Sequence, residues 1–382
     1  MSPWDGLTGQ DDAVALLRAA ASHDPGNASM THSWLLTGPP GSGRSNLAYA
    51  FAAALLSRGP EDEESTGRQV AARSHPDLAV LSTERVVITI DEVRRLVSAS
   101  QFSPSVGRYR VVVVEDADRM TERTSNLLLK ALEEPPPRTV WVLCAPSEAD
   151  LVPTIRSRVR SVRLRTPSVE DVADLLVRRD GVDRATAVVA AREAQSHIGM
   201  ALRLARDPGA RERRAATLRT ALEVRSVPDA VRAAATLLAL AGDDAKAITE
   251  ERDAQERESA LRSLGVAPGG TVPPALRGQL RALEEDQKRR ATRSLRDGLD
   301  RIMVDLQSLY RDVLLLQLGV VGEPVNEAVR DRLDAAARSS TPARTLAVLD
   351  AITTARQRVE GNVAPALALE ALLVTVSRHG RA

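Results

Sequence analysis

The stretch THSWLLTGPPGSGRSNLAYAFAAALL, residues 31–56, decides the fold class of this chain. It combines an apolar run over 33–37, a glycine-rich loop over 38–45 and an Ala- and Leu-rich run over 46–56. A strand that leads through such a loop into a helix places backbone N–H groups at the N-terminus of that helix, where they bind phosphate. The stretch therefore predicts an α/β core with a phosphate-binding loop.

The loop fits the pattern G-x-x-x-x-G-K-[ST] except at one position, because Arg44 stands where the pattern has lysine. Gly38, Gly41 and Gly43 leave room for backbone N–H groups to approach an anion, and Ser45 keeps the hydroxyl of the pattern. Arginine is planar and forked whereas lysine is a compact point charge, so the two are not interchangeable. The loop predicts nucleotide binding, and Arg44 argues against turnover.

Arg44 also has a second interpretation. Of the 52 basic residues in the chain only three are lysines, so a general preference for arginine also explains the substitution, although a working ATPase should resist it at this position. The loop by itself does not choose between these two interpretations.

Composition excludes several classes of protein. The 382 residues are 43% hydrophobic and 27% charged, which is typical of a globular chain with two or three domains. The single cysteine, Cys144, excludes an internal disulfide and a cysteine-rich zinc module. No apolar run is long enough for a membrane span, and acidic residues at 5, 11 and 12 are unlike a signal peptide. We expect a cytoplasmic protein without zinc and without membrane contact.

Strands and helices alternate over residues 1–166. Expected strands are 33–37, 77–81, 110–114, 140–144 and 161–164, and expected helices are 46–56, 90–100 and 121–132. Short apolar strands separated by helices indicate a parallel sheet covered on both faces. The polar stretch GPEDEESTG, 59–67, is expected to be an exposed loop.

The remainder of the chain is predicted to be helical. Ser168 and Asp171 predict a capping box for a helix over 169–178, followed by helices over 185–194 and from Ile198. We expect three domains: a core over 1–166, a small helical lid over 167–208 and a helical domain over 209–382. A loop is expected at 268–274. The charged stretches 243–262 and 281–300 are interpreted as solvated helical faces, rather than nucleic-acid tails, because both signs are interleaved.

Two acids follow the apolar run 111–114. Glu115 and Asp116 stand where a nucleotide hydrolase places a Mg²⁺ ligand and a water-polarising carboxylate. The usual order is Asp then Glu, and here it is reversed. The acids are therefore either a degenerate catalytic pair or ordinary polar residues at the end of a strand.

The segment TIRSRVR, 154–160, contains a third candidate. Arg158 follows Ser157 near the end of an expected helix, where an arginine can point toward a neighbouring subunit. The alternative is an ordinary surface arginine in an arginine-rich stretch. Spacing alone does not decide between them.

Taken together, these segments resemble the bacterial clamp-loader branch of the AAA+ family, and within it the delta-prime type of DNA polymerase III subunit. The matching segments are THSWLLTGPPGSG (31–43), SHPDL (74–78), ITIDEVRRL (88–96), SNLLLKALEEPP (125–136) and TIRSRVR (154–160). The resemblance extends over residues 1 to about 208. It implies a P-loop AAA+ core, a lid and a C-terminal collar that holds subunits together in a ring.

Departures from the family pattern indicate which subunit type this is. Besides Arg44 and the pair 115–116, the segment 144–146 (CAP) lacks the polar residue that senses the γ-phosphate, and Met200 stands where the lid has an arginine. Residues 57–76 contain no cysteine, so the zinc module of motor subunits is absent. The resemblance then implies a subunit that does not hydrolyse ATP, with ADP or ATP at most statically bound.

The arginine that acts on a neighbour is retained. Clamp loaders carry their arginine finger in the sequence SRC; Ser157 and Arg158 are kept, and Val159 replaces the cysteine. The resemblance therefore implies that Arg158 acts in trans on the ATP of an adjacent subunit. The implied partners are the motor (gamma/tau) and delta subunits of a hetero-pentamer, the sliding clamp, and primed DNA through the assembled complex.

Two other functions remain as alternatives. An ATP-hydrolysing motor subunit of the gamma/tau type would need Arg44 and Glu115 to be functional. A standalone DNA-binding protein is disfavoured, because residues 1–165 contain 19 basic against 20 acidic side chains and the whole chain has a net charge of +1.

Overall fold

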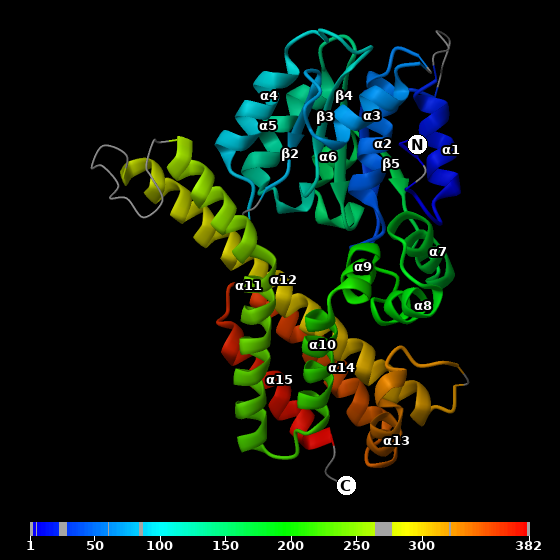
Figure 1. Cartoon of the computed structure of the whole chain (residues 1–382), viewed down its shortest axis with the longest axis vertical. Coiled ribbons are helices and arrows are strands. Elements are labelled where there is room, and N and C mark those ends of the chain that lie inside the picture. Colours follow the sequence, from blue (N-terminus) through cyan, green and yellow to red (C-terminus); the bar gives the residue numbers. More distant parts are fainter. Residues whose placement is uncertain are drawn as a thin grey trace. The chain divides into compact units, whose positions relative to one another are not determined.

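The computed structural model describes residues 3–4, 6–22, 29–59, 61–83, 87–263, 277–320 and 322–379 (Figure 1). The chain divides into two compact units, Met1–Arg206 and Asp207–Ala382. The first contains the sheet and the second is helical in the part that the structure describes. A separate lid between core and collar, as expected from sequence, stays a prediction.

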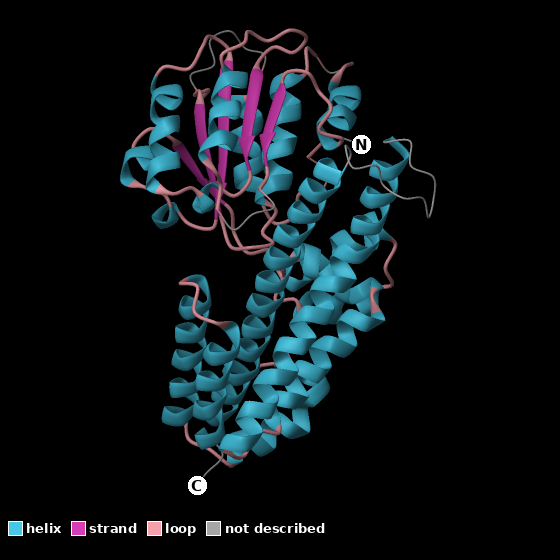
Figure 2. Cartoon of the chain, turned by 90° about the vertical axis from the view of Figure 1, so that its left-hand side faces the viewer, coloured by secondary structure: helices cyan, strands magenta, loops and turns pink. Residues whose placement is uncertain are grey.

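A five-stranded parallel sheet forms the centre of the first unit (Figure 2). Its strands are β1 (Ser33–Thr37), β2 (Leu78–Leu81), β3 (Arg110–Val114), β4 (Thr139–Ala145) and β5 (Arg160–Arg163), in the order β2-β3-β4-β1-β5. All residues of β1, β3 and β4 are buried, as expected for central strands covered on both faces. The five strands predicted from sequence are confirmed.

Helices cover both faces of this sheet because successive strand residues point to opposite sides. Trp34 and Leu36 of β1 pack with the cluster that includes α1 (Asp11–Ala20) and α2 (Arg44–Leu56), whereas Leu35 packs on the opposite face. That face is covered by α4 (Ile90–Ser100), α5 (Glu122–Glu133) and the short α6 (Pro153–Arg156). Two 3₁₀ turns, Ala117–Arg119 and Glu148–Asp150, complete this part. The predicted fold class, an α/β P-loop core followed by helices, is confirmed.

The expected loop over 59–67 is wrong in its second half. Helix α3 (Glu63–Ala71) begins there, and it packs on α2. Thr66 and Val70 lie one turn apart on the buried side of α3, where Val70 joins the cluster under α2. Because Val70 is the only large apolar residue in this helix, the residues of α3 show almost no helical periodicity of apolar side chains.

Three short helices follow the sheet within the first unit: α7 (Val169–Asp180), α8 (Arg184–Glu193) and α9 (Ile198–Arg206). The capping box at the start of α7 is confirmed, since the Ser168 hydroxyl accepts from the Asp171 N–H and the Asp171 carboxylate accepts from the Ser168 N–H. Gly181 ends α7 with a φ of 67°, a conformation that favours glycine.

The second unit consists of α10 (Pro208–Leu222), α11 (Val227–Ser263), α12 (Arg277–Gln317), α13 (Arg330–Arg338), α14 (Pro342–Glu360) and α15 (Pro365–His379), with a 3₁₀ turn at Glu327–Val329. Both charged stretches lie within the long helices α11 and α12, so their assignment as helix is confirmed. The loop expected at 268–274 lies outside the described residues. Within the described ranges, none of the helices is long and apolar enough to cross a membrane.

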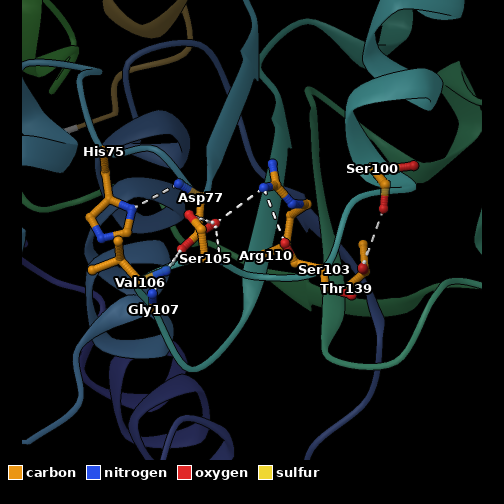
Figure 3. A network of polar contacts seen from close by, with 9 residues as sticks. All are labelled: His75, Asp77, Ser100, Ser103, Ser105, Val106, Gly107, Arg110 and Thr139. Carbon is orange, nitrogen blue, oxygen red and sulfur yellow. Dashed lines mark hydrogen bonds and ion pairs between the residues drawn. The ribbon is translucent and has the colours of Figure 1, made fainter.

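The SHPDL segment anchors the loop that precedes β3 (Figure 3). Asp77 is fully buried, and its carboxylate accepts hydrogen bonds of 2.7 Å from the backbone N–H groups of Ser105, Val106 and Gly107. The Arg110 guanidinium forms an ion pair with the same carboxylate at 3.1 Å. Burial by itself raises the pKa of Asp77, but these N–H groups and the Ser105 hydroxyl outweigh it and lower the pKa to about 2. Asp77 therefore stays ionised and fixes the amino end of the sheet.

Candidate functional site

The glycine-rich loop has the backbone conformation that its glycines predict. Gly41 and Gly43 have φ values of +80° and +92°, which disfavour residues with a side chain, and Gly43 is the N-cap of α2. A Cβ on Gly38 would lie 2.8 Å from Ser42 Oγ and 2.9 Å from Leu164 Cβ. The sequence therefore builds the cradle of a phosphate-binding loop in front of α2.

Arg44 is turned back onto this loop. Its Nη1 donates to the carbonyl oxygen of Gly38, while the Gly38 N–H donates to the carbonyl oxygen of Pro146 at 3.1 Å. Ser45 lies beside Arg44, partly buried in the first turn of α2. Both polar groups of Gly38 and one donor of Arg44 thus have partners within the chain. The cation of this loop contacts the loop itself.

The N-terminus of α9 contacts the same loop. A Cβ on Gly41 would lie 2.2 Å from Cγ of the His197 ring, and the Ile198 N–H donates to the Gly41 carbonyl at 3.4 Å. His197 Nδ1 accepts from the Met200 N–H at 3.1 Å, which fixes the ring at the start of α9. The imidazole therefore packs directly on the phosphate-binding loop.

The acid pair also has partners within the chain. Glu115 Oε1 accepts a hydrogen bond from the Tyr49 hydroxyl and forms an ion pair of 2.7 Å with Arg73 Nη2. Burial, then the hydrogen bond to Glu115, raises the pKa of Tyr49, so the phenol remains a donor. Asp116 forms an ion pair with Arg119, with 3.8 Å between Oδ2 and Nε. The carboxylate expected to hold a metal ion is instead bound by α2 and by the residues after α3.

The end of β4 lacks a polar sensor. Ala145 pairs with Thr37 in the sheet, and Cys144 is fully buried next to it. Burial raises the pKa of the Cys144 thiol to about 12, against the opposing effect of Arg44, so the thiol is neutral. Among the residues that the structure describes, no three His, Cys, Asp or Glu side chains are grouped as metal ligands would be.

Arg158 lies in the turn between α6 and β5, with Ser157 as the C-cap of α6. Its Nη1 donates to the Thr154 carbonyl at 2.7 Å and to the Ser157 hydroxyl at 3.0 Å. Its Nε donates to the carboxylate of Glu133, the last residue of α5, and Nη2 forms an ion pair with the same carboxylate. The Arg158 side chain is 33% exposed and that of Glu133 45%, so the pair lies at the surface.

The predicted site residues fall into two groups, one at the carboxyl ends of the strands and the other at their amino ends. The loop follows β1, the acid pair follows β3 and Cys144 lies at the end of β4, so all three are brought together at the carboxyl ends of these strands. Arg158 precedes β5, and Glu133 precedes β4, so both lie at the amino end. Since β5 runs parallel to β1 and spans on the order of 13 Å, Arg158 is remote from the loop of its own chain.

Several residues in these contacts were missed by sequence reasoning: Gln10, Tyr49, Arg73, Glu133 and His197. The Gln10 amide joins the phosphate-binding loop to the segment after β5. Its Nε2 donates to the Arg165 carbonyl at 2.7 Å and to the Ser42 carbonyl at 3.5 Å, and its Oε1 accepts from the Arg165 N–H at 3.0 Å. None belongs to the pattern of the loop, and each acts through a partner distant in sequence. Glu133 alone had a signal, because it lies in the segment SNLLLKALEEPP.

The sequence of this chain is similar to those of known DNA polymerase III subunits. Residues 9–168 match the family described as DNA polymerase III, delta subunit. A DNA polymerase III subunit delta' of Pseudomonas aeruginosa is 39% identical over 140 residues, which are 35% of this chain and 43% of the relative. The resemblance to the delta-prime family is confirmed. The subunit delta' of Escherichia coli is 32% identical over 180 residues, which are 45% of this chain and 54% of that relative.

The chain thus spans about half the length of the curated relatives that it matches. Among solved structures, a gamma subunit-related protein of Thermotoga maritima is similar over 97% of this chain and 100% of its own, with 18% identity and a TM-score of 0.42. The sequence match is carried by the N-terminal half, which contains the phosphate-binding loop and Arg158.

Proposed function

We propose that this chain is a delta-prime-type clamp-loader subunit that does not hydrolyse ATP and that inserts Arg158 into the ATP site of a neighbouring subunit. The observation that supports this most is that Arg158 and the phosphate-binding loop lie at opposite ends of the strands. Arg158 precedes β5, whereas the loop lies at the carboxyl ends of the strands. Any nucleotide phosphate that Arg158 binds therefore belongs to another chain.

The chemistry of such a contact is that of charge stabilisation. As the γ-phosphoryl group is transferred, negative charge spreads over its oxygens and onto the leaving group, and a planar guanidinium binds two of these oxygens at once. In other nucleotide hydrolases an arginine supplied in trans accelerates the reaction about 10³- to 10⁵-fold. Arg158 is one-third exposed in this chain, which makes its guanidinium accessible to a partner.

The chain's own loop is proposed to be inactive in hydrolysis. Arg44 contacts Gly38, Glu115 is bound by Tyr49 and Arg73, and Ala145 offers no polar sensor. Backbone N–H groups of Gly41, Gly43 and Ser45 would still allow ADP or ATP to bind statically, because such loops hold phosphate mainly through the main chain. Hydrolysis also needs a carboxylate that is free to align the attacking water, and Tyr49 and Arg73 already occupy the carboxylate of Glu115.

In this proposal the chain acts in the cytoplasm as one member of a hetero-pentamer with motor (gamma/tau) and delta subunits. The helical residues 209–382 form the collar that joins it to them, 167–208 the lid, and 1–166 the AAA+ core. The complex opens the sliding clamp and loads it on primed DNA. The chain itself contacts DNA only as part of the ring.

The test is Arg158→Ala in a reconstituted loader, measured as ATP turnover stimulated by the clamp and primed DNA. We expect turnover at the adjacent site to fall by about 10³-fold or more. Arg163→Ala, which removes the exposed arginine at the end of the edge strand β5, is the matched control and should leave turnover unchanged. Unchanged stimulated turnover with Arg158→Ala would refute the role in trans.

A second measurement separates this proposal from an ATP-hydrolysing motor subunit, which the intact glycine pattern of the loop favours. The purified chain should show no steady-state ATP turnover, because Glu115 is held by Arg73 and Tyr49. Turnover that Gly43→Asp abolishes would instead assign the motor role. Gly43 has a φ of +92°, so an aspartate there distorts the loop as well as repelling phosphate.

A further inference from the structure

The guanidinium of Arg158 has one edge that binds its own turn and another that binds Glu133. Nη1 is occupied by two acceptors of the turn, the Thr154 carbonyl at 2.7 Å and the Ser157 hydroxyl at 3.0 Å. The edge formed by Nε and Nη2 faces the Glu133 carboxylate. This second edge has the fork geometry with which arginine binds carboxylate or phosphate oxygens in pairs.

Phosphate and Glu133 therefore compete for the same two donors. A nucleotide phosphate that approaches Arg158 from a neighbouring chain meets the negative charge of Glu133 beside the guanidinium. Binding of the phosphate requires that the carboxylate leave the Nε–Nη2 edge. The contact to Thr154 and Ser157 need not break, so the turn keeps the side chain in place during the exchange.

We propose that the ion pair with Glu133 holds Arg158 in a position in which its Nε and Nη2 donors are occupied. Glu133 thereby lowers the affinity of Arg158 for the neighbour's ATP. The proposal rests on the function in trans given above. Glu133 acts through Arg158 and touches no nucleotide itself, so it is a positioning residue. It ends α5 in the segment ALEEPPP, 131–137, and the three prolines that follow Glu134 fix where α5 stops.

The exposure of the pair suits an exchange of partners. An ion pair with side chains 33% and 45% exposed is weakly held, because water solvates both charges well. A dianionic or trianionic phosphate in an enclosed site attracts the guanidinium more strongly than one carboxylate does. The Glu133–Arg158 ion pair is thus favoured in the isolated chain, and a nucleotide phosphate of a partner chain replaces Glu133 when it reaches Arg158.

The experiment uses Glu133→Gln in the reconstituted loader, with Glu134→Gln as the matched control. Glu134 is the exposed C-cap of the same helix, so its change alters the net charge equally. We expect Glu133→Gln to raise ATP turnover without clamp and DNA by about two- to fivefold, the range that a surface pair allows. Turnover with clamp and DNA should stay as in the unmodified loader, so the stimulation ratio falls.

Two further measurements distinguish a positioning role from a structural one. The difference between Glu133→Gln and the unmodified chain should shrink as salt increases, because salt screens the surface pair. In an Arg158→Ala background, Glu133→Gln should have no effect, since Glu133 acts only through Arg158. An effect that persists in that background overturns the proposal.

Different outcomes would refute the role of Glu133 and the function of Arg158 in trans. If Arg158→Ala lowers turnover but Glu133→Gln behaves like Glu134→Gln, Glu133 has no gating role while the function in trans stands. If Arg158→Ala leaves turnover unchanged, the function in trans fails, and the role of Glu133 fails with it.

Discussion

Two arginine–carboxylate pairs of the first unit have the same chemistry and different surroundings. Asp77 is fully buried and Arg110 is 11% exposed, whereas Glu133 is 45% and Arg158 33% exposed. Asp77 also accepts from three consecutive backbone N–H groups. Both pairs lie near the amino ends of the strands: Asp77 precedes β2 and Arg110 begins β3, whereas Glu133 precedes β4 and Arg158 precedes β5.

Burial determines which of these ion pairs can exchange partners. Removing one member of a buried pair leaves an uncompensated charge in a medium of low dielectric constant, so a buried pair is fixed. A half-exposed pair loses little when it separates, because water replaces the partner. Asp77–Arg110 is therefore part of the fold, and Glu133–Arg158 is available for function.

The largest expected effect breaks the buried pair. Asp77→Ala should lower the free energy of unfolding of the first unit by about 3–5 kcal/mol, because three N–H groups and the Arg110 charge lose their acceptor. All three tryptophans, Trp4, Trp34 and Trp141, lie buried in this unit. Urea unfolding of the full chain, followed by tryptophan fluorescence, therefore reports on this unit alone.

Glu133→Ala is the matched control, with an expected loss below about 1 kcal/mol. Equal losses for Asp77→Ala and Glu133→Ala would contradict the distinction drawn between the two pairs. The backbone at both positions tolerates alanine, since neither residue has a positive φ.

A smaller effect is expected from acid. The pKa of Asp77 falls from 3.8 to about 2 on folding, so its ionisation stabilises the fold above the unfolded pKa and this stabilisation is lost as the pH falls toward 2. The whole contribution is about 2 kcal/mol, and about half of it is lost on going from about pH 6 to about pH 3. Asp77→Asn serves as the reference because asparagine does not titrate.

The measurement is the difference in unfolding free energy between the unmodified chain and Asp77→Asn at the two pH values. This difference should narrow by about 1 kcal/mol in acid. A difference that is constant or grows on acidification would mean that the pKa of Asp77 is not depressed in the folded chain.

Much of the fold could be predicted because its signals are local. Apolar runs such as 110–114 and 140–144 and the glycines at 38, 41 and 43 determine strands and loop from a few neighbouring residues. The exception was α3, where Val70 is the only large apolar side chain and most of the helix is polar. Its position on α2 depends on burial of Thr66 and Val70, which neighbouring residues do not indicate.

The candidate site was predicted in its residues but not in its pairings. The sequence identified Arg44, Glu115 and Arg158 by their place in a pattern. It did not indicate that Glu115 would meet Tyr49, 66 residues earlier, or that Arg158 would meet Glu133, 25 residues earlier. Such contacts are set by how helices cross the sheet, because side-chain periodicity carries no information on distant partners.

Short patterns of residue type were therefore enough to predict the strand–loop–helix unit over 31–56, the parallel sheet and the resemblance to clamp-loader subunits. The folded chain was needed to show that His197 packs on Gly41 and that Arg73 and Tyr49 hold Glu115. It was also needed to show that Arg158 and the loop lie at opposite ends of the strands. Because all strands of a parallel sheet run in the same direction, their carboxyl ends lie at one side of the sheet and their amino ends at the other. Residues that follow a strand are therefore separated from residues that precede one by the length of the strand.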